Sequence, residues 1–287
     1  MTVLILGSQG NLGTQLVKVF STEYTTVAWD KEDLDVLDFS VAQKKISELK
    51  PDLIINTIAY NAVDACEQAE SYDLAVQLNI NWPRVLAEIA YQLSATLIHY
   101  STDYVFSGTE EKREFSETET PNPINKYGES KFAGERELLK WGELGLSYYL
   151  IRSSKLFGPQ GTSPLAKPSF FSIIARQAQE KAELQIVNEE LSCFTYTVDL
   201  ALATKRLWEL ETPVGIYHLV NEGAYTWYEG ARKFFQLLDW PVKLRAVRSE
   251  DNRREARRPK FSVLKNNRLK KMRPFREALS EYLKEGL

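Results

Sequence analysis

The chain contains little cysteine and little histidine. Cys66 and Cys193 are its only cysteines, which is too few for a disulfide framework or a cysteine-rich metal site. We therefore interpret both as structural thiols of a cytoplasmic protein. His99 and His218 are the only histidines. They lie far apart in strand-like runs without carboxylates at metal-ligand spacing, so we expect core histidines and no metal site.

Long apolar runs and a strong net charge are also missing. No stretch approaches the 18 apolar residues of a membrane helix, and the opening MTVLILG lacks a cationic leader. The formal charge is −3, which gives no indication of a nucleic-acid or membrane partner. Basic residues nevertheless gather between Lys243 and Arg276, where fourteen Lys or Arg stand against three acids.

The sequence does contain short β-rich runs that alternate with longer amphipathic ones. TVLIL, TTVAW and DLIINT are separated by expected helices at about 11–20 and 41–49, and TLIHYS and SYYLIRSS continue the series. This alternation is typical of an α/β protein with a doubly wound parallel (Rossmann) sheet.

Turn-forming residues after Gly158 predict that the chain leaves the sheet there. The runs ELQIV and GIYHLV look like returning strands. We therefore expect a smaller C-terminal substrate domain beside the sheet. The predicted boundaries are 1–152 for the dinucleotide-binding domain, rejoined by about 187–221, and 153–186 with 222–287 for the substrate domain.

Three glycines, Gly7, Gly10 and Gly13, stand three residues apart between the first strand and the first helix. Glycines there let the backbone approach a pyrophosphate at the helix N-terminus, which indicates a dinucleotide, although a plain turn is the alternative. Asp30 follows Gly10 by 20 residues and suits a ribose hydroxyl, whereas Lys31 could pair with a phosphate. We therefore expect NADH to be used and NADPH to be tolerated.

Tyr127 and Lys131 stand four residues apart, so on a helix they share one face. An ammonium near a phenol lowers the phenol pKa and makes tyrosine usable as an acid or base. A solvated surface pair is the alternative. The run YSTDYVFSG at 100–108 favours catalysis, because it places Ser101, Thr102 and neighbouring polar residues at the carboxyl end of a strand, where open α/β sheets bind ligands.

Together these motifs resemble the extended short-chain dehydrogenase/reductases, and within them the dTDP-4-dehydrorhamnose reductase family. The resemblance extends over nearly the whole chain. It includes the segments INTIAYNAVDACE, LNINWPRVLA, YTVDLA, GIYHLVNEG and RRPKFSVL in the same order.

The resemblance implies hydride transfer from NADH or NADPH to a nucleotide-linked 4-keto-6-deoxysugar, in the first place dTDP-4-dehydro-L-rhamnose. It implies that Tyr127 is the general acid, that Lys131 anchors the nicotinamide ribose, and that Thr102 orients the keto oxygen. The implied cofactor-binding residues, besides Tyr127 and Lys131, are Gly7, Gln9, Gly10, Asn11, Leu12, Asp30, Asp35, Val36, Thr57, Ala59, Tyr60 and Asn79. The implied substrate-binding residues are Thr102, Asp103, Tyr104, Phe106 and Lys155.

Lys155 departs from the family, which usually carries an aromatic residue at this position. We expect it to reach a sugar hydroxyl or the diphosphate instead. The basic segment is expected to form a folded wall that faces the diphosphate, with Arg254, Arg257 and Arg258 as candidates and a solvated basic surface as the alternative.

Two other functions remain open at this point. One is a 4-epimerase with permanently bound NAD. The other is a non-catalytic regulatory subunit similar to the β subunit of methionine adenosyltransferase. We expect a nucleotide-sugar ligand and a possible homodimer.

Overall fold

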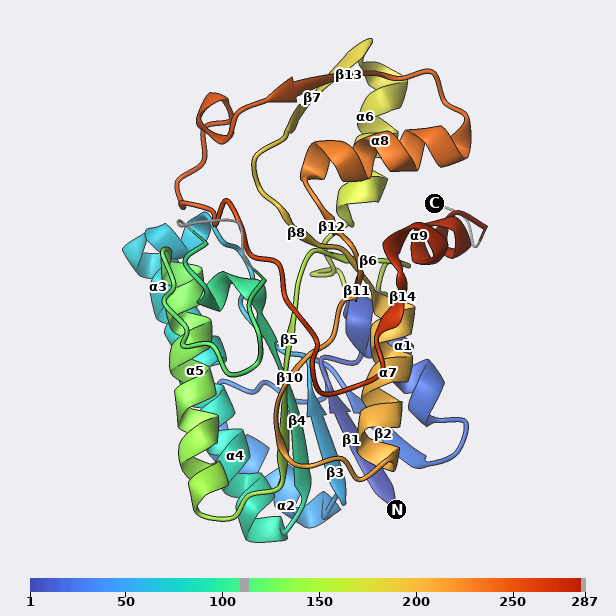
Figure 1. The fold of residues 1–287 in the computed structure, drawn as a ribbon. Helices are drawn as coiled ribbons and strands as arrows, with labels where there is room; N and C mark the ends of the chain where they lie inside the picture. The colour runs from blue at the N-terminus through green and yellow to red at the C-terminus, as the bar shows by residue number, and fades with distance from the viewer. Residues whose placement is uncertain (109–113, 285–287) are drawn as a thin grey trace.

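Six parallel strands form the centre of the molecule, in the order β10-β5-β4-β3-β1-β2 (Figure 1). The structure is a computed structural model that describes residues 1–108 and 114–284. The predicted α/β fold with a doubly wound parallel sheet is confirmed. The strands are β1 (Thr2–Leu6), β2 (Thr25–Trp29), β3 (Leu53–Asn56), β4 (Thr96–Thr102), β5 (Tyr148–Ser153) and β10 (Gly215–His218).

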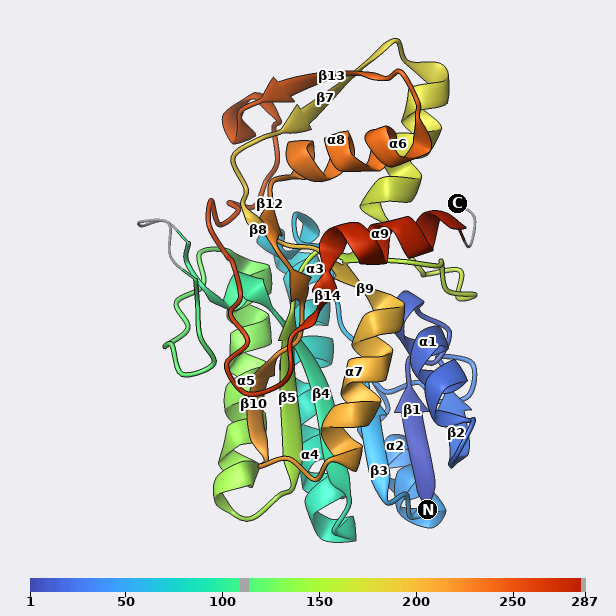
Figure 2. The ribbon, with the colours of Figure 1, turned by 45° about the vertical axis from the view of Figure 1, so that its right-hand side comes forward.

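Helices cover both faces of this sheet because each face is apolar (Figure 2). α1 (Asn11–Phe20) and α7 (Thr197–Glu209) pack on one face. The other face carries α2 (Phe39–Leu49), α4 (Trp82–Leu93) and α5 (Lys126–Glu143). α3 (Ala69–Val76) runs through a π-helical turn, Gln77–Asn81, into α4. The helix predicted at 11–20 has those bounds, and α2 begins earlier than predicted because the Asp38 carboxylate caps the Val41 amide.

A smaller unit lies beyond the carboxyl ends of the strands (Figures 1 and 2). Its core is an aromatic cluster that includes Phe171, Phe194 and Phe275. Its main elements are α6 (Phe170–Glu180), β7 (Glu183–Val187), α8 (Trp227–Leu238), β13 (Lys243–Val247) and α9 (Phe275–Lys284). We propose that this unit is the smaller domain, with the boundaries that the sequence indicates.

One expected strand does not return to the central sheet. GIYHLV supplies β10, but ELQIV forms β7, which pairs in parallel with β13 of the smaller unit. A strand-like run indicates a strand without indicating its partner, and here the partner lies about 60 residues further along the chain. Short strands connect the two units: β6 (Leu156–Phe157), β8 (Ser192–Cys193), β9 (Thr195–Tyr196), β11 (Asn221–Glu222), β12 (Ala224–Tyr225) and β14 (Met272–Pro274).

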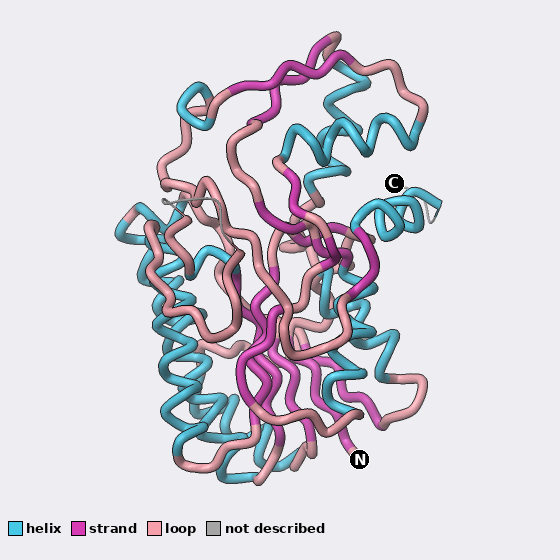
Figure 3. The backbone as a smooth tube through the Cα atoms, in the orientation of Figure 1, coloured by secondary structure: helices cyan, strands magenta, loops and turns pink. Residues whose placement is uncertain are grey.

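The segment 252–264 runs back from the smaller unit across the ends of β4 and α5 (Figure 3). Phe261 N donates to Gly108 O at 3.1 Å, Ser262 N to Leu191 O at 2.9 Å, and Phe115 N to Val263 O at 2.8 Å. These bonds fix the segment over the edge of the sheet at which the sequence places its polar residues. In residues 1–108 and 114–284, no helix combines the length and apolar character that crossing a membrane requires.

Candidate active site

The glycine turn connects β1 to α1 where the strand order reverses between β1 and β3. Gly7 has φ +75°, a left-handed conformation that favours glycine. A Cβ on Gly7 would lie 2.6 Å from Thr57 Oγ1, and one on Gly13 would lie 2.0 Å from Gly7 O. Gly10 caps α1 without a side-chain hydrogen bond, so helical amides stay available to an anion. This cradle fits the pyrophosphate of a dinucleotide.

Asp30 lies immediately beyond β2, beside the same turn. Its Oδ2 accepts the Gln9 amide at 2.9 Å, and its Oδ1 accepts the Lys31 amide at the same distance. The structure therefore brings together Asp30 and Gln9, two of the predicted cofactor-binding residues. The Asp30 carboxylate ties the turn to the end of β2.

A second group of predicted cofactor residues surrounds the loop after β3. Thr57 Oγ1 donates to Leu6 O at 2.8 Å, joining β3 to β1. Asn79, in the π-helical turn, accepts the Tyr60 amide and donates to Tyr60 O, both at 2.9 Å. Its amide also donates to Ser130 Oγ, next to Lys131 on α5. Asn79 therefore links the loop that carries Thr57, Ala59 and Tyr60 to the helix that carries the tyrosine and lysine.

The segment 158–168 rests on the glycine turn. Ser163 N donates to Gln9 O at 3.0 Å. Asn11 Oδ1 accepts the Gly161 amide, and Asn11 Nδ2 donates to Lys167 O, both at 2.8 Å. Asn11 is therefore engaged with this loop. Three other predicted cofactor residues face elsewhere: the side chains of Leu12 and Val36 are buried in the two core clusters, and Asp35 is an exposed residue that accepts the Leu37 amide.

Tyr127 and Thr102 meet at the carboxyl end of β4. Asn125 caps α5 through the Gly128 amide at 2.7 Å, and Tyr127 sits in the first turn. Its ring packs edge-on against Tyr104, with ring centroids 6.0 Å apart. Burial raises the pKa of the Tyr127 phenol well above its ordinary value, and a hydrogen bond with Thr102 opposes that shift. The phenol is therefore protonated at neutral pH.

Lys131 lies on the same helix, one turn further on, and is 2% exposed. Its Nζ donates to Tyr100 O at 2.7 Å and lies 3.4 Å from His99 Nε2. Burial lowers the pKa of Lys131 to about 8, although the charge of Glu135 acts in the opposite direction. The sequence predicts that Lys131 lowers the pKa of Tyr127, yet in this structure the pKa of Tyr127 is raised, because burial is its largest cause.

Two predicted substrate residues are turned into the protein. Asp103 is 3% exposed, and its Oδ2 accepts the Ser262 hydroxyl at 2.6 Å while its Oδ1 accepts Thr102 Oγ1 at 3.1 Å. Phe106 is 1% exposed and stacks on Phe115. Asp103 and Phe106 therefore fix the segment 252–264 and the core beneath it, and their side chains do not face an open cleft.

Lys155 extends toward the smaller unit. Its Nζ donates to Glu190 O at 2.8 Å and to Tyr225 O at 3.0 Å, and it lies 4.4 Å from the ring centroid of Trp227. In this structure the Lys155 ammonium is therefore held by two backbone carbonyls, and its contact with a sugar hydroxyl or the diphosphate stays a prediction. The residue has a left-handed φ of +38°, which directs its side chain across the junction between β5 and the smaller unit.

Replacing Lys155 with Met should change how stability depends on pH. Burial lowers the pKa of Lys155 from 10.5 to about 8, so between these values the unfolded chain binds more protons and stability rises with pH. Relative to Lys155→Met, the wild-type free energy of unfolding should rise by about 3 kcal/mol across this interval. Urea unfolding of both proteins at its two ends measures the change. Other titrating groups contribute equally to both proteins and cancel when the two free energies of unfolding are subtracted. If the free energy difference between the two proteins does not depend on pH, the ammonium of Lys155 is not buried.

The basic segment lines a cleft of about 1050 Å³ between the smaller unit and the loop after β3. Arg254, Arg257 and Arg258 all line it. Arg258 forms a two-pronged ion pair with Asp64, with Nη2 2.6 Å from Oδ2. Arg254 pairs with the buried carboxylate of Glu190. Two of the three guanidinium groups are therefore held in place by carboxylates, one from Asp64 of the cleft wall and one from the buried Glu190.

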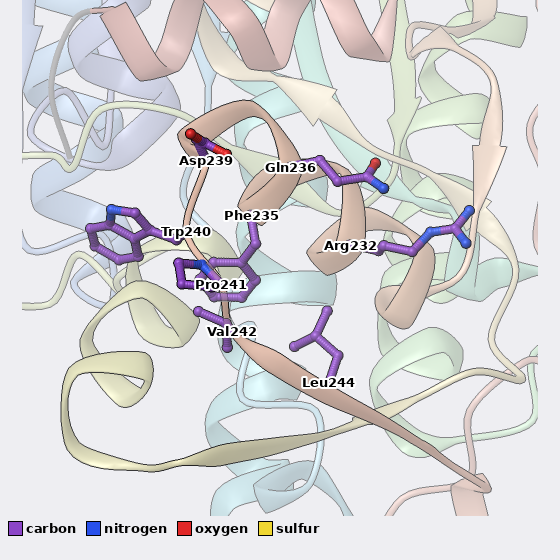
Figure 4. A pocket seen from close by; sticks show the side chains of 8 residues that line it. All are labelled: Arg232, Phe235, Gln236, Asp239, Trp240, Pro241, Val242 and Leu244. Atoms are coloured by element: carbon purple, nitrogen blue, oxygen red, sulfur yellow. The ribbon is translucent and has the colours of Figure 1, made fainter.

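Another hollow lies at the far end of the smaller unit, where α8 meets β13 (Figure 4). Phe235, Pro241, Val242 and Leu244 contribute its apolar lining. None of the residues that the sequence singles out lines this hollow, and it lies away from the carboxyl ends of the central strands (Figure 1). The two cysteines are buried and free.

The sequence did not predict that Asp64, Glu190 and Ser262 hold site residues in place. Each binds a predicted site residue that is far away in sequence, 194 residues in the case of Asp64 and Arg258. Two of them lie within segments that carry the resemblance, Asp64 in INTIAYNAVDACE and Ser262 in RRPKFSVL. His99 was expected to be a core histidine, which is confirmed by its burial, but its contact with Lys131 was not foreseen.

The family model described as "RmlD substrate binding domain" matches residues 1–287. Among curated proteins, the spore coat polysaccharide biosynthesis protein SpsK of Bacillus subtilis is 31% identical over 99% of this chain and 97% of its own length. A dTDP-4-dehydrorhamnose reductase of Streptomyces griseus is 32% identical over 97% of this chain and 91% of its own length.

A solved structure shows the same arrangement. The dTDP-4-dehydrorhamnose reductase of Bacillus anthracis in complex with NADP superposes with a TM-score of 0.90 at 32% identity, covering 99% of each chain. Sequence and structure thus agree over nearly the full length of the chain. The chain belongs to the RmlD substrate binding domain family of extended short-chain dehydrogenase/reductases.

Proposed function

We propose that this protein reduces the 4-keto group of a dTDP-linked 6-deoxysugar with NADH or NADPH. The proposed substrate is dTDP-4-dehydro-L-rhamnose and the product is dTDP-L-rhamnose. The observation that carries the proposal is the meeting of Tyr127 and Thr102 at the carboxyl end of β4, beside Lys131. A reductase needs a proton donor at the keto oxygen, and a phenol that stays protonated at neutral pH supplies one.

The positions of the site residues indicate which of them would bind the cofactor and which the sugar nucleotide. Gly7, Gly10 and Gly13 would hold the pyrophosphate at the N-terminus of α1, and Asp30 would accept the adenosine ribose hydroxyls. When bound, the nicotinamide supplies the hydride. Thr102 would orient the keto oxygen.

The cleft wall would bind the rest of the substrate. Arg254, Arg257 and Arg258 line it, and guanidinium groups suit a diphosphate because they present several donors in a fixed plane. The carboxylates of Asp64 and Glu190 would keep Arg258 and Arg254 oriented before the substrate arrives.

Turnover of the purified protein tests this proposal. We expect one equivalent of NADH or NADPH to be oxidised for each dTDP-4-dehydro-L-rhamnose consumed. The loss of the nicotinamide absorbance measures this oxidation. Oxidation with none of the dTDP-linked keto-sugars would reject the reductase. A tightly retained NAD with no net oxidation would indicate the 4-epimerase, and stoichiometric copurification with an adenosyltransferase would indicate the regulatory subunit.

NADH should be the better cofactor, with NADPH tolerated. The carboxylate of Asp30 lies beside Gln9 in the glycine turn and would repel a phosphate on the adenosine ribose, whereas Lys31 would attract it. Asp30→Asn keeps an acceptor for the Gln9 amide and removes the charge, so it should shift the kcat/KM ratio toward NADPH by about 5- to 10-fold.

Lys31→Met is the matched control and should lower kcat/KM for NADPH alone. A large preference of the wild-type protein for NADPH at equal concentration would show that Asp30 does not bind the adenosine ribose hydroxyls.

We also propose that the protein is a homodimer and is located in the cytoplasm. Sedimentation of the purified protein tests the homodimer.

A further inference from the structure

Three buried polar side chains connect the core to Lys131, which is itself buried. Trp82 Nε1 donates to Asn56 Oδ1 at 3.2 Å, and Asn56 Nδ2 lies 2.9 Å from His99 Nδ1. His99 Nε2 lies 3.4 Å from Lys131 Nζ. All four side chains are 2% exposed or less. Water therefore does not compete for these contacts, and each donor must face an acceptor.

The orientation of the Asn56 amide is fixed by its neighbours. Its Oδ1 accepts two N–H groups, from Trp82 and from the Ile58 backbone at 3.3 Å. The opposite orientation would place an NH₂ group against both donors. Asn56 must therefore present Nδ2 to His99, and Nδ2 can only donate.

That donation decides the tautomer of His99. Nδ1 must accept from Asn56, so it carries no hydrogen, and in a neutral imidazole the hydrogen then resides on Nε2. The ring is neutral because burial holds the pKa of His99 well below its ordinary value. An N–H group therefore faces the amino group of Lys131. Two donors oppose each other if Lys131 is an ammonium, whereas a neutral amine offers a lone pair.

We propose that His99 is a positioning residue that presents its Nε2–H to the amino group of Lys131 and thereby favours the neutral amine in the ligand-free protein. Tyr100 O, at 2.7 Å from Nζ, accepts one amine hydrogen and fixes the direction of the side chain. Only the importance of Lys131 for turnover rests on the proposed function. The tautomer and the charge of Lys131 can be measured without substrate.

The other charged groups around Lys131 do not cancel the effect of this contact. Glu135, on the same face of α5, favours the ammonium. Its carboxylate is held by Arg152 of β5, with Nη2 2.7 Å from Oε2, and both side chains are buried. The Arg152 guanidinium therefore offsets the charge of Glu135. Tyr127, one turn earlier on α5, is a neutral phenol. On the β4 side, Lys131 meets His99 and the Tyr100 carbonyl.

The tautomer can be observed directly, because the chain contains only two histidines. In ¹⁵N NMR spectra of histidine-labelled protein without an affinity tag, we expect Nε2 of His99 to give the signal of a protonated nitrogen and Nδ1 that of an unprotonated one. His99→Phe assigns the signals. A protonated Nδ1 with an unprotonated Nε2 would overturn the proposal.

Reversing the tautomer should change the proton affinity of Lys131. In Asn56→Asp a carboxylate replaces the amide donor, so the His99 hydrogen should move to Nδ1 and leave Nε2 as an acceptor. The pKa of Lys131, about 8 in the wild type, should then rise by at least one unit, a tenfold gain in proton affinity. A ¹³C titration of labelled lysine measures it, with Lys131→Met for assignment.

The new carboxylate would also attract the ammonium by its charge alone. The double variant Asn56→Asp/His99→Phe, compared with His99→Phe alone, measures the rise in the Lys131 pKa that the charge causes without the histidine. If the tautomer matters, Asn56→Asp should raise the Lys131 pKa more when His99 is present. Equal rises in both backgrounds would overturn the proposal. Failure of the proposed function would give a different result, because the expected NMR signals would still be observed while no keto-sugar is reduced.

Discussion

Tyr127→Phe should lower kcat by about 100- to 10,000-fold with little change in the affinity for NADH or NADPH. The substitution removes the hydroxyl and keeps the ring, so the edge-on contact with Tyr104 survives. The loss is that of a general acid. Single-turnover kinetics with the keto-sugar measures the chemical step, and fluorescence titration measures the affinity for the cofactor.

The pKa of Tyr127 supports the role of acid over that of base. Burial and the charge of Asp103 raise it, and the hydrogen bond with Thr102 opposes them. A phenol with a raised pKa keeps its proton throughout the neutral range, so the donor is fully present at neutral pH and is lost only in strong alkali. Activity should therefore not fall on the acid side through titration of Tyr127.

Tyr91→Phe is the matched control. Tyr91 is an exposed tyrosine on α4 whose ring packs against Trp141, so loss of its hydroxyl should leave kcat unchanged. Near-normal turnover of Tyr127→Phe would mean that Tyr127 and Lys131 are only a helix face, and that another group supplies the proton.

The sheet could be predicted from the sequence because its strands are short apolar runs at regular places. β1 is buried along four of its five residues, as a strand covered by helices on both faces should be. The glycine turn could be predicted because its glycines carry a backbone requirement that no other residue meets. Gly7 has the left-handed φ and Gly13 the close approach. Local rules of spacing suffice where the physical cause is local.

The rest depends on partners that the sequence does not reveal. Asp103 follows a strand, and its position in the sequence is typical of a substrate-binding residue. In the structure its carboxylate instead accepts a hydrogen bond from Ser262, which is 159 residues away. The direction of the Tyr127 pKa shift likewise depends on where the amino group of Lys131 points. That group is directed to the Tyr100 carbonyl, so burial dominates at the phenol. A spacing of four residues predicts a shared face without fixing the hydrogen bonds made there.

Gly13→Ala should lower the free energy of unfolding by about 3 kcal/mol and weaken cofactor binding by at least about 100-fold. In an ordinary helix the same change stabilises by up to ~1 kcal/mol, so the sign itself is informative. The new Cβ would lie 2.0 Å from Gly7 O and 2.9 Å from Ser8 Cα, both backbone atoms. Gly7 cannot retreat easily, because its amide bonds Trp29 O at 2.9 Å and its carbonyl accepts Thr57 Oγ1 at 3.1 Å.

Gly10→Ala separates the effect on the fold from the effect on the ligand. Gly10 has φ −71°, which alanine adopts freely, and a Cβ there would approach Gly7 O to only 3.3 Å. Its free energy of unfolding should fall by no more than about 1 kcal/mol, the scale of a lost helix cap. Cofactor affinity should still fall, because the added methyl group occupies space that the proposed pyrophosphate needs. If Gly13→Ala unfolds at the same urea concentration as the wild type, the turn is looser than this geometry requires. If Gly10→Ala binds NADH normally, the pyrophosphate does not lie against Gly10, and the cofactor contacts assigned to the turn are wrong.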